Sequence, residues 1–385
     1  MNITIHVSAI QAARKLLTRI RFERLKLSVL NHVLATVDAA GLTLAVCDLD
    51  HWLETRLPAV IDPFETGRFL IPAEALKAAA KGDKRCCAHF AFADTPEGPT
   101  LTLTVPCGGK NVVSVHKPEP VAYFPERPGV EGRVTTIPKE TLIALQVVAC
   151  CASTDATRYV LNGVLFSPDD GGILIATDGK RLAGAPARFA GSEFILPSTA
   201  AHVLDFPDFT GRDAAIQQPD EGKGTHVQFR SGPHTLIARM IEGIYPNYRQ
   251  VIPHEFGSDA TIPETHRPAL ISWLRSLDGK GGHNNPVCLT WDKPGHLTLT
   301  IRDCDETGAT IHVPASITGQ PPVIAFAPGY LAEALAIGST LRLIDGISPG
   351  MAADSSSGSF CVLMPCRCVA EEVGVGKARA PGVAA

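Results

Sequence analysis

Helix-forming segments recur along this chain at a step of about 60–66 residues, and this regularity limits the possible fold more than any other feature. Four segments open with an aliphatic residue followed by proline, which suits a first helical turn because its missing N–H is not needed there. Apolar residues follow at intervals of three and four, which predicts short amphipathic helices. The six segments begin at Val7, Ile71, Ile137, Leu196, Ile262 and Phe326.

Short runs between these helices alternate apolar and polar residues, as half-buried strands do. Examples are "TLTLTVP" at 100–106, "NVVSVH" at 111–116 and "HLTLTIR" at 296–302. One helix with about four strands is too small for a good core, so two units should pair into a domain of about 125 residues. The sequence therefore predicts an α+β fold of three similar domains, 1–128, 129–253 and 254–369, followed by a disordered tail at 370–385.

Charge and cysteine content narrow the class of protein. The 385 residues include 35 Lys and Arg against 39 Asp and Glu, which excludes a uniformly basic nucleic-acid coat but allows basic patches. Among 11 cysteines, the adjacent pairs Cys86–Cys87 and Cys150–Cys151 are poorly placed for bridging, which indicates reduced thiols. We see no signal peptide and no run of about 18 apolar residues, and we expect a cytoplasmic protein without a membrane span.

Motifs for catalysis are weak. "GISPG" at 346–350 matches a nucleophile elbow, but Pro349 follows Ser348 and has no N–H for an oxyanion hole. "DGKR" at 178–181 lacks the rest of a phosphate loop, "DCDE" at 303–306 is expected to be a hairpin turn, and "PCRC" at 365–368 has no second ligand pair for zinc. We predict no catalytic residue, metal or cofactor. A hydrolase that uses Ser348 or a cysteine, and a monomeric peptide-binding scaffold, are the alternatives.

Four blocks of sequence are distinctive together. They are "RYVLNGVLF" at 158–166, "ATDGKRLA" at 176–183, "IEGIYPNYRQVIP" at 241–253 and "FCVLMPCR" at 360–367. In order and spacing they resemble the bacterial β sliding clamp family, the processivity subunit of DNA polymerase III. "LSVLNHVLATV" at 27–37 and "CDLD" at 47–50 are similar to its first domain. The resemblance spans residues 1 to about 368 and is weakest in 50–130 and 254–340.

The resemblance implies a DNA-clamp fold of three similar domains, each built from two helix-plus-four-strand units. It implies a homodimer, joined head to tail into a ring whose hole is lined by helices. Such a ring is not an enzyme: it encircles duplex DNA without sequence preference. Replicative polymerase, clamp loader and repair proteins attach to it through short linear motifs. A divergent paralogue that serves a plasmid or a specialised repair system is the alternative, because the helices at 196–206 and 326–338 contain no Lys or Arg.

In this family the TDG-[HK]-R-L turn forms one wall of a hydrophobic cleft that captures those motifs. Apolar side chains would form its floor, basic side chains its rim, and Gly179 would allow a turn with positive φ. Cys366 stands where the best-known members carry Met, which would reshape the pocket. The cleft implied for this chain consists of Arg158, Leu161, Thr177, Gly179, Lys180, Arg181, Leu182, Pro246, Val251, Ser348, Val362, Met364, Pro365, Cys366 and Arg367.

Two further surfaces follow from the resemblance. Helix-borne cations should attract phosphates in a salt-dependent way that permits sliding. The DNA-binding candidates are Lys15, Arg19, Arg24, Lys77, Lys81, Lys139, Tyr159 and Arg275, of which Arg24 and Tyr159 match family positions. The edge strand "NVVSVH" should enter the dimer joint with Val113 and Val115, because an exposed edge strand needs a cover. We expect Trp273 and Leu277 to anchor the partner side.

Overall fold

The computed structural model describes residues 1–20, 22–39, 41–61, 66–219, 224–277, 286–301 and 308–366. The chain forms two compact bodies. Body 1 contains 1–149, 162–173 and 187–244, and body 2 contains 150–161, 174–186 and the chain from 245 onward. In the described ranges, no helix is both long and apolar enough to cross a membrane.

A β-α-β-β-β unit occurs six times along the chain, which confirms the predicted helix repeat. The first two units are β1 (Asn2–His6), α1 (Val7–Leu17), β2 (His32–Asp38), β3 (Gly41–Cys47) and β4 (His51–Leu57), then β6 (Gly67–Pro72), α2 (Ala73–Ala79), β7 (Cys87–Thr95), β8 (Gly98–Cys107) and β9 (Lys110–His116). The next two are β10 (Arg133–Ile137), α3 (Lys139–Ala149), β11 (Gly163–Ser167), β12 (Ile173–Thr177) and β13 (Arg181–Pro186), then β14 (Phe194–Pro197), α4 (Ser198–Leu204), β15 (Ala214–Gln218), β16 (His226–Ser231) and β17 (His234–Arg239). The last two are β18 (Ser258–Thr261), α6 (Arg267–Leu277), β19 (Val287–Thr290), β20 (His296–Ile301) and β21 (Ala309–Pro314), then β23 (Ile324–Phe326), α7 (Pro328–Ile337), β24 (Thr340–Leu343), β25 (Gly350–Ala353) and β26 (Phe360–Leu363). Short elements outside this pattern are β5 (Val60–Ile61), α5 (Pro207–Thr210) and β22 (Ser316–Gly319).

Several helices begin later than the aliphatic-proline signal suggested. Pro72 and Pro197 keep an extended ψ of 139° and act as the residue before the helix, so α2 and α4 start one residue after them. Strands β6 and β14 therefore run directly into α2 and α4. The segment after Ile262 first makes a turn, in which the N–H of His266 donates to the carbonyl of Pro263 at 3.0 Å, and α6 starts only at Arg267.

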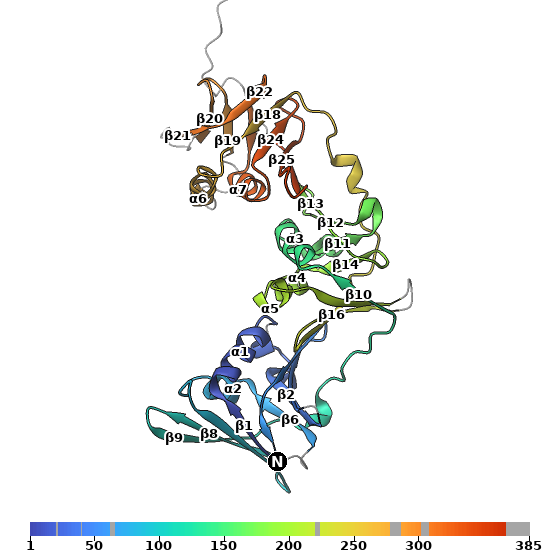
Figure 1. The fold of residues 1–385 in the computed structure, drawn as a ribbon, viewed down its shortest axis with the longest axis vertical. Coiled ribbons are helices and arrows are strands. Elements are labelled where there is room, and N and C mark those ends of the chain that lie inside the picture. Colours follow the sequence, from blue (N-terminus) through green and yellow to red (C-terminus); the bar gives the residue numbers. More distant parts are fainter. Residues whose placement is uncertain are drawn as a thin grey trace, which may run out of the picture. The chain divides into compact units, whose positions relative to one another are not determined.

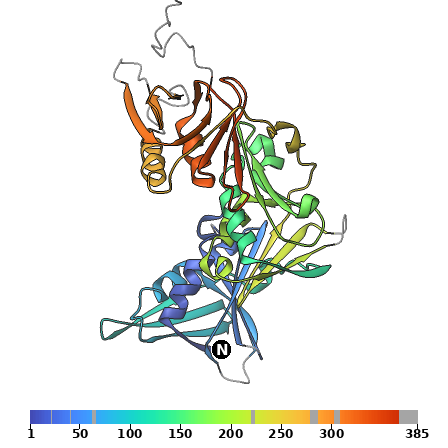
Figure 2. The same cartoon turned by 45° about the horizontal axis from the view of Figure 1, so that its top comes forward.

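The helices are amphipathic and pack in pairs. In α1 the buried residues are Val7, Ile10, Ala13, Leu16 and Leu17, which form one stripe. Full burial of each large aliphatic side chain contributes about 1.5–3 kcal/mol. Helix α1 packs on α2, α3 on α4 and α6 on α7, as Figure 1 shows for the first and last pairs. In Figure 2 the blue helices of the first pair lie against blue-green strands, consistent with the contact between α2 and β8.

Each pair of units exchanges its first strands. Strand β1 pairs with β7 of the following unit, from Asn2 opposite Ala91 to His6 opposite Cys87, while β6 returns to pair with β2. The same antiparallel exchange joins β10 to β15, β14 to β11, β18 to β24, and β23 to β19. Neither unit of a pair therefore has a complete sheet by itself, which explains why the repeat comes in twos.

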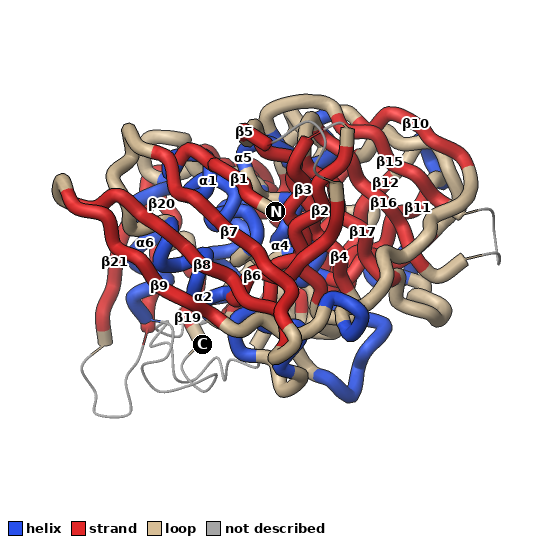
Figure 3. The backbone as a smooth tube through the Cα atoms, turned by 90° about the horizontal axis from the view of Figure 1, so that it is seen from below, coloured by secondary structure: helices blue, strands red, loops and turns tan. Residues whose placement is uncertain are grey.

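The last strands of the units form joints between successive pairs. In body 1, β4 pairs with β17 and creates an eight-stranded sheet in the order β10-β15-β16-β17-β4-β3-β2-β6. In body 2, β13 pairs with β26 in the run β13-β26-β25-β24-β18-β22. Among the described strands, the last strands β9 and β21 have no such neighbour: β9 ends the sheet β5-β1-β7-β8-β9, visible in Figure 3, and β21 ends the sheet β21-β20-β19-β23.

A histidine closes one end of the β4–β17 joint. The Nδ1 of His51 lies 3.0 Å from Oδ2 of Asp48, and its Nε2 lies 3.0 Å from Oγ1 of Thr199, which begins α4 with Ser198. Since a carboxylate only accepts, Nδ1 carries the proton that is donated to Asp48. Burial opposes the ionisation of Asp48, but the hydrogen bonds from the side chain and N–H of His51 prevail and lower its pKa below 3.8.

A second histidine lies at the other end of the joint, and it belongs to the opposite strand of the pair. The Nε2 of His234 lies 2.9 Å from Oδ2 of Asp208, and its Nδ1 lies 2.8 Å from Oγ1 of Thr55. Here the histidine belongs to β17 and the threonine to β4, whereas the first contact has the histidine on β4. We call these two Asp–His–Thr contacts the histidine clasps, and they connect the first and second pairs of units within body 1.

Candidate peptide-binding site

The turn after β12 is held by its own side chains. The carboxylate of Asp178 accepts the backbone N–H groups of Lys180 at 2.8 Å and Arg181 at 3.0 Å. The hydroxyl of Thr177 donates to the carbonyl of Arg181 at 2.6 Å and accepts the N–H of Gly179 at 3.1 Å. Gly179 has a φ of +85°, a conformation that side chains disfavour. This sequence thus specifies a rigid, protruding turn.

Arg181 connects the turn to its surroundings. Its side chain is 9% exposed, and its guanidinium contacts Asp178 at 3.2 Å and donates to the carbonyl of Cys150 at 2.8 Å. It also forms an ion pair with Glu333 and lies 4.5 Å from the ring centroid of Tyr330, both on α7. Arg181 is the buried partner of this ion pair, whereas the side chain of Glu333 is 34% exposed. The guanidinium therefore makes its contacts within the protein and holds the turn in place.

The end of β26 lies beside this turn, as the resemblance implied. Leu182 is directly opposite Val362 in the ladder between β13 and β26. Just beyond the ladder, the N–H of Met364 donates to the carbonyl of Lys180 at 3.0 Å. The N–H of Cys366 donates to the carbonyl of Ala325 at 2.7 Å, which fixes the segment that follows Met364. Two of the distinctive sequence blocks are thereby brought into contact.

Exposure divides the predicted cleft residues into two groups. Leu182 and Val362 are each 3% exposed, so they form the buried support under the site. Met364 and Val251 are each 50% exposed, and they present apolar surface to solvent. Pro246 is also exposed, whereas Leu161, Pro365 and Cys366 are half-buried. Tyr245 directly precedes Pro246. Burial raises the pKa of its hydroxyl, and an interaction with the Thr177 backbone opposes this rise. The segment at Tyr245 therefore lies beside the turn.

The loop before β25 adds an apolar residue that the sequence analysis missed. Ile347 is 85% exposed and precedes Ser348. The carboxylate of Asp345 accepts the N–H of Ile347 at 2.9 Å, the N–H of Ser348 at 2.6 Å and the hydroxyl of Ser348 at 2.9 Å. These hydrogen bonds, led by the one from Ile347, lower the pKa of Asp345. A large apolar side chain among turn residues was the signal in "GISPG" that could have identified Ile347.

Ser348, Cys47 and Cys150 do not have the environment that a nucleophile needs. The Ser348 hydroxyl donates to Asp345, and in the described part of the chain no histidine is hydrogen-bonded to it. The hydrogen bond to Cys151 and burial raise the pKa of Cys150, and burial raises that of Cys47. Protonated thiols are poor nucleophiles. Among described residues, no group of three His, Cys, Asp or Glu side chains could hold a metal ion.

The basic residues predicted for the rim differ in the contacts that their side chains make. Arg158 is 54% exposed, and its Nη1 donates to the carbonyl of Asp178 at 3.1 Å. It belongs to the short helix Ala156–Asn162 and has a non-helical φ of −109°. Lys180 is exposed at the tip of the turn. Arg367 lies outside the described residues.

The predicted DNA-binding residues are mostly solvent-exposed. Lys15, Lys77, Lys81, Lys139 and Arg275 are exposed, and Tyr159 is 58% exposed. Arg19 is instead engaged within body 1: it lies 3.3 Å from Nε2 of His202 and 4.0 Å from the carboxylate of Asp205. The side chain of Arg24 is outside the described part of the structure.

The predicted dimer residues lie on two separate elements. Val113 and Val115 are 60% and 64% exposed on β9, where Val112 is also 55% exposed. Trp273 and Leu277 are half-buried on α6. The "DCDE" segment, for which a hairpin turn was expected, is outside the described residues, as are residues 367–385.

Comparison with known proteins gives a consistent result, although no family model matches the chain. The β sliding clamp of Synechococcus elongatus is 30% identical over 321 residues, which cover 80% of this chain and 82% of that protein. The DNA polymerase β subunit of Streptococcus pyogenes has a TM-score of 0.81 at 17% identity, covering 96% of this chain and 100% of that chain. The sliding clamp of Bartonella birtlesii, solved bound to griselimycin, has a TM-score of 0.80 at 22% identity, with coverage of 96% and 100%. With this identity and coverage and the sixfold β-α-β-β-β repeat, the chain belongs to the β sliding clamp family.

Proposed function

We propose that this protein is a DNA sliding clamp, a non-catalytic processivity factor. It encircles duplex DNA and tethers DNA polymerase III, the clamp loader and repair proteins through short linear motifs. The observation that carries this proposal is the contact between Lys180 and Met364, which joins the rigid turn to the end of β26 and leaves apolar side chains exposed around it. A protein that works on chromosomal DNA in this way belongs in the cytoplasm.

The motif-binding cleft is built around the turn at 177–181. Met364, Val251 and Ile347 present its apolar contact surface, and the flexible thioether of Met364 can adapt to different motifs. Lys180 is exposed at the tip of the turn, and Arg158 is exposed while it donates to the carbonyl of Asp178, so both can reach peptide carbonyls or carboxylates from the rim. The remaining members support these contacts from below: Leu161, Leu182, Val362, Pro365 and Cys366, with Arg181 holding the turn in place.

Two chains form the ring through the edge strands that have no neighbour in one chain. At both internal joints, the last strand of a pair's first unit (β4 or β13) meets the last strand of a later pair's second unit (β17 or β26). The same rule applied to the two remaining last strands unites β21 of one copy with β9 of another. This contact is head to tail and closes after two copies if the rotation per domain is near 60°. It covers Val113 and Val115, and it brings α6 with Trp273 and Leu277 beside α2.

We propose three domains of two units each, 1–128, 129–253 and 254–369. Their six helices face the DNA, and Lys15, Lys139 and Arg275 provide exposed positive charge. Helices α4 and α7 contribute no Lys or Arg, so few phosphates are neutralised, and both the attraction to DNA and its dependence on salt concentration are modest. Weak, sequence-independent attraction suits a ring that slides.

A titration with a labelled peptide tests the cleft. A fluorescein-labelled peptide of the QLxLF type should bind the wild type, and Met364→Ala with Val251→Ala should weaken binding about tenfold or more, since both exposed apolar contacts are lost. Val134→Ala is the matched control, because it shortens a comparably exposed apolar residue on β10, which belongs to neither the proposed cleft nor the proposed dimer joint. Equal affinity of the double variant and the wild type would remove the cleft assignment.

A further inference from the structure

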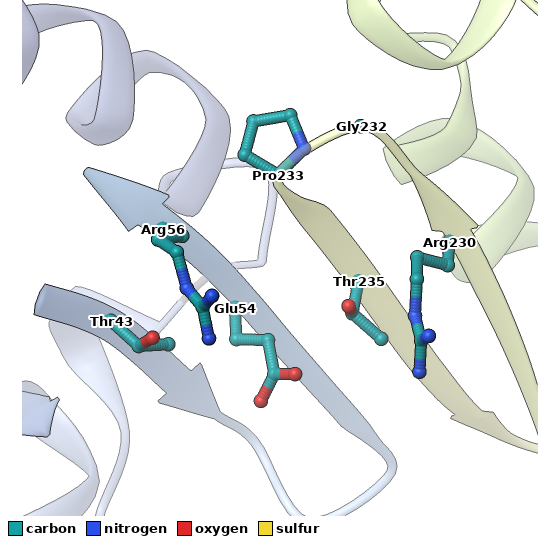
Figure 4. A pocket seen from close by; sticks show the side chains of 7 residues that line it. All are labelled: Thr43, Glu54, Arg56, Arg230, Gly232, Pro233 and Thr235. Carbon is teal, nitrogen blue, oxygen red and sulfur yellow. The ribbon is translucent and has the colours of Figure 1, made fainter. Parts of the chain in front are cut away.

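The eight-stranded sheet of body 1 has a hollow of about 390 Å³ that the clamp function does not use. Thr55 is fully buried while Arg56 is exposed, so alternate residues of β4 face opposite sides of the sheet. Helix α1 packs on β4 from the side of Thr55. Figure 4 shows the other side, where Arg56 and Arg230 flank Glu54 and Thr235.

The linker between the first two pairs of units covers the neighbouring part of the same face. Trp52, two residues before Glu54 and on the same side of β4, packs against Phe124 of the linker with ring centroids 5.9 Å apart. Val121 and Val130 add to this cover. The linker leaves the end of the sheet near β4 residue 56 uncovered, and the hollow is formed there.

The carboxylate of the hollow is already neutralised. Oε2 of Glu54 accepts the indole N–H of Trp52 at 2.8 Å and the Nε of Arg127 at 3.0 Å, and Oε1 accepts the Nη2 of Arg127 at 3.1 Å. This is a two-pronged arginine–carboxylate pair, which is among the strongest polar contacts in proteins. Arg127 also donates to Gln228 at 2.9 Å, so it is fixed on the sheet.

The two arginines of the hollow have no such partner. Among the described residues, no carboxylate forms an ion pair with Arg56 or Arg230. A third cation is close, because a Cβ placed on Gly232 would lie 3.0 Å from Nη1 of Arg212. Like charges held near each other on a sheet are unfavourable unless an anion joins them. The hollow is thus a local positive site on a chain whose net charge is −4.

The strand register gives the spacing of the Cα atoms of Arg56 and Arg230. Arg230 is opposite Thr235, Thr235 is opposite Glu54, and Arg56 lies two residues further along β4. Two strand spacings across and two residues along place the two Cα atoms about 12 Å apart. In an extended peptide, side chains four residues apart lie on the same face and about 13–14 Å apart, so two carboxylates at that interval match this spacing.

We propose that this hollow binds an acidic peptide segment of a partner protein, in which two Asp or Glu side chains four residues apart pair with Arg56 and Arg230. Thr235 lies on β17, between the strands that carry the two cations, and Thr43 lies opposite Arg56 on β3. Both threonines line the hollow, and their hydroxyls can donate to the same carboxylates. The site is separate in sequence and structure from the turn at 177–181. A partner anchored by a linear motif can therefore use it as a second point of attachment.

Fluorescence anisotropy with a fluorescein-labelled peptide Gly-Ser-Glu-Ser-Gly-Ser-Glu-Ser-Gly, and its counterpart with Gln in place of both Glu, tests the proposal. The Glu peptide should bind the wild type about tenfold more tightly than the Gln peptide, and R56Q with R230Q should abolish this preference. R133Q with R188Q removes two exposed cations elsewhere in body 1 and should keep it. Equal binding of the Glu peptide by R56Q/R230Q and R133Q/R188Q would overturn the proposal.

Two further measurements complete the design. All four substitutions are at exposed positions, so circular dichroism should be unchanged, and binding of the QLxLF peptide by R56Q/R230Q should equal that of the wild type. Failure of the cleft and failure of this site are thus distinguishable. A labelled oligothymidylate that binds more tightly than the Glu peptide, and is weakened by R56Q/R230Q but not by R133Q/R188Q, would overturn the peptide assignment in favour of nucleic acid.

Discussion

Replacing His234 by leucine should loosen the β4–β17 joint by a calculable amount. The histidine is 8% exposed and lies beside Phe206 and Phe209, with ring centroids 6.3 Å and 6.0 Å away, so leucine keeps most of the apolar packing. The main loss is the hydrogen bond to Thr55, whose side chain is fully buried. An orphaned buried hydroxyl costs about 1–3 kcal/mol. Asp208 is 49% exposed, so its carboxylate regains water at little cost.

A second substitution separates this polar loss from packing. Thr55→Val alone leaves Nδ1 of His234 without a donor and should also cost about 1–3 kcal/mol. When both changes are made, no buried polar group is left unpaired, and the double variant should be close to the wild type. The coupling free energy should therefore equal the sum of the two single costs, about 4 kcal/mol if each is about 2 kcal/mol, and each single substitution alone should change an opening equilibrium about 30-fold.

Native-state hydrogen exchange measures this opening where it occurs. Peptides that cover β4 and β17 should exchange faster in each single variant and should return toward wild-type protection in the double variant. Thr102→Val on β8 is the control and should leave exchange in β4 and β17 unchanged. If the effects of the two single substitutions simply add in the double variant, the clasp has no coupling energy and the reasoning is refuted.

Three other outcomes follow from the structure. Gly179→Ala should lower stability by about 1–2 kcal/mol and weaken binding of the QLxLF peptide, because its φ of +85° is unfavourable for a side chain; an unchanged melting temperature and affinity would contradict this. Because the pKa of Asp48 is lowered on folding, its contribution is complete above about pH 4 and is lost as the pH falls through the folded value, so Asp48→Asn should flatten the acid limb of the stability profile measured by thermal unfolding. Val113→Glu should convert the dimer into monomers in light scattering, since it places a charge on the exposed edge of β9, and a dimer of undiminished affinity would argue against that interface.

The periodic parts of this fold could be predicted from local sequence. The stripe of apolar residues from Val7 to Leu17 identifies α1, and alternation in "NVVSVH" identifies β9. Proline gave approximate helix starts, but Pro72 belongs to the end of β6, because its fixed φ is equally compatible with an extended residue that caps a helix. Helix existence was thus accessible; α1 starts at the predicted residue, and the starts of the other five predicted helices are shifted by two to five residues.

Contacts between distant segments could not be predicted in the same way. The exchange that pairs Asn2 with Ala91 depends on competition among many possible strand partners. The resemblance identified Arg181 as part of the cleft, but its ion pair with Glu333 makes it an internal support, and this depends on where α7 packs. Ile347 was overlooked because its segment was examined only as a possible nucleophile elbow.

The exchange of first strands determines when the nascent chain can fold. Strand β1 leaves the ribosome first, yet β7, which pairs with its whole length, ends at Thr95, so while about 90 residues are synthesised the two-residue strand β5 is its one earlier partner among the described strands. At translation speeds of about 5–20 residues per second, this delay lasts seconds. During that interval the alternating apolar side chains of β1 are open to wrong pairing, and a chaperone that shields extended segments would favour correct closure.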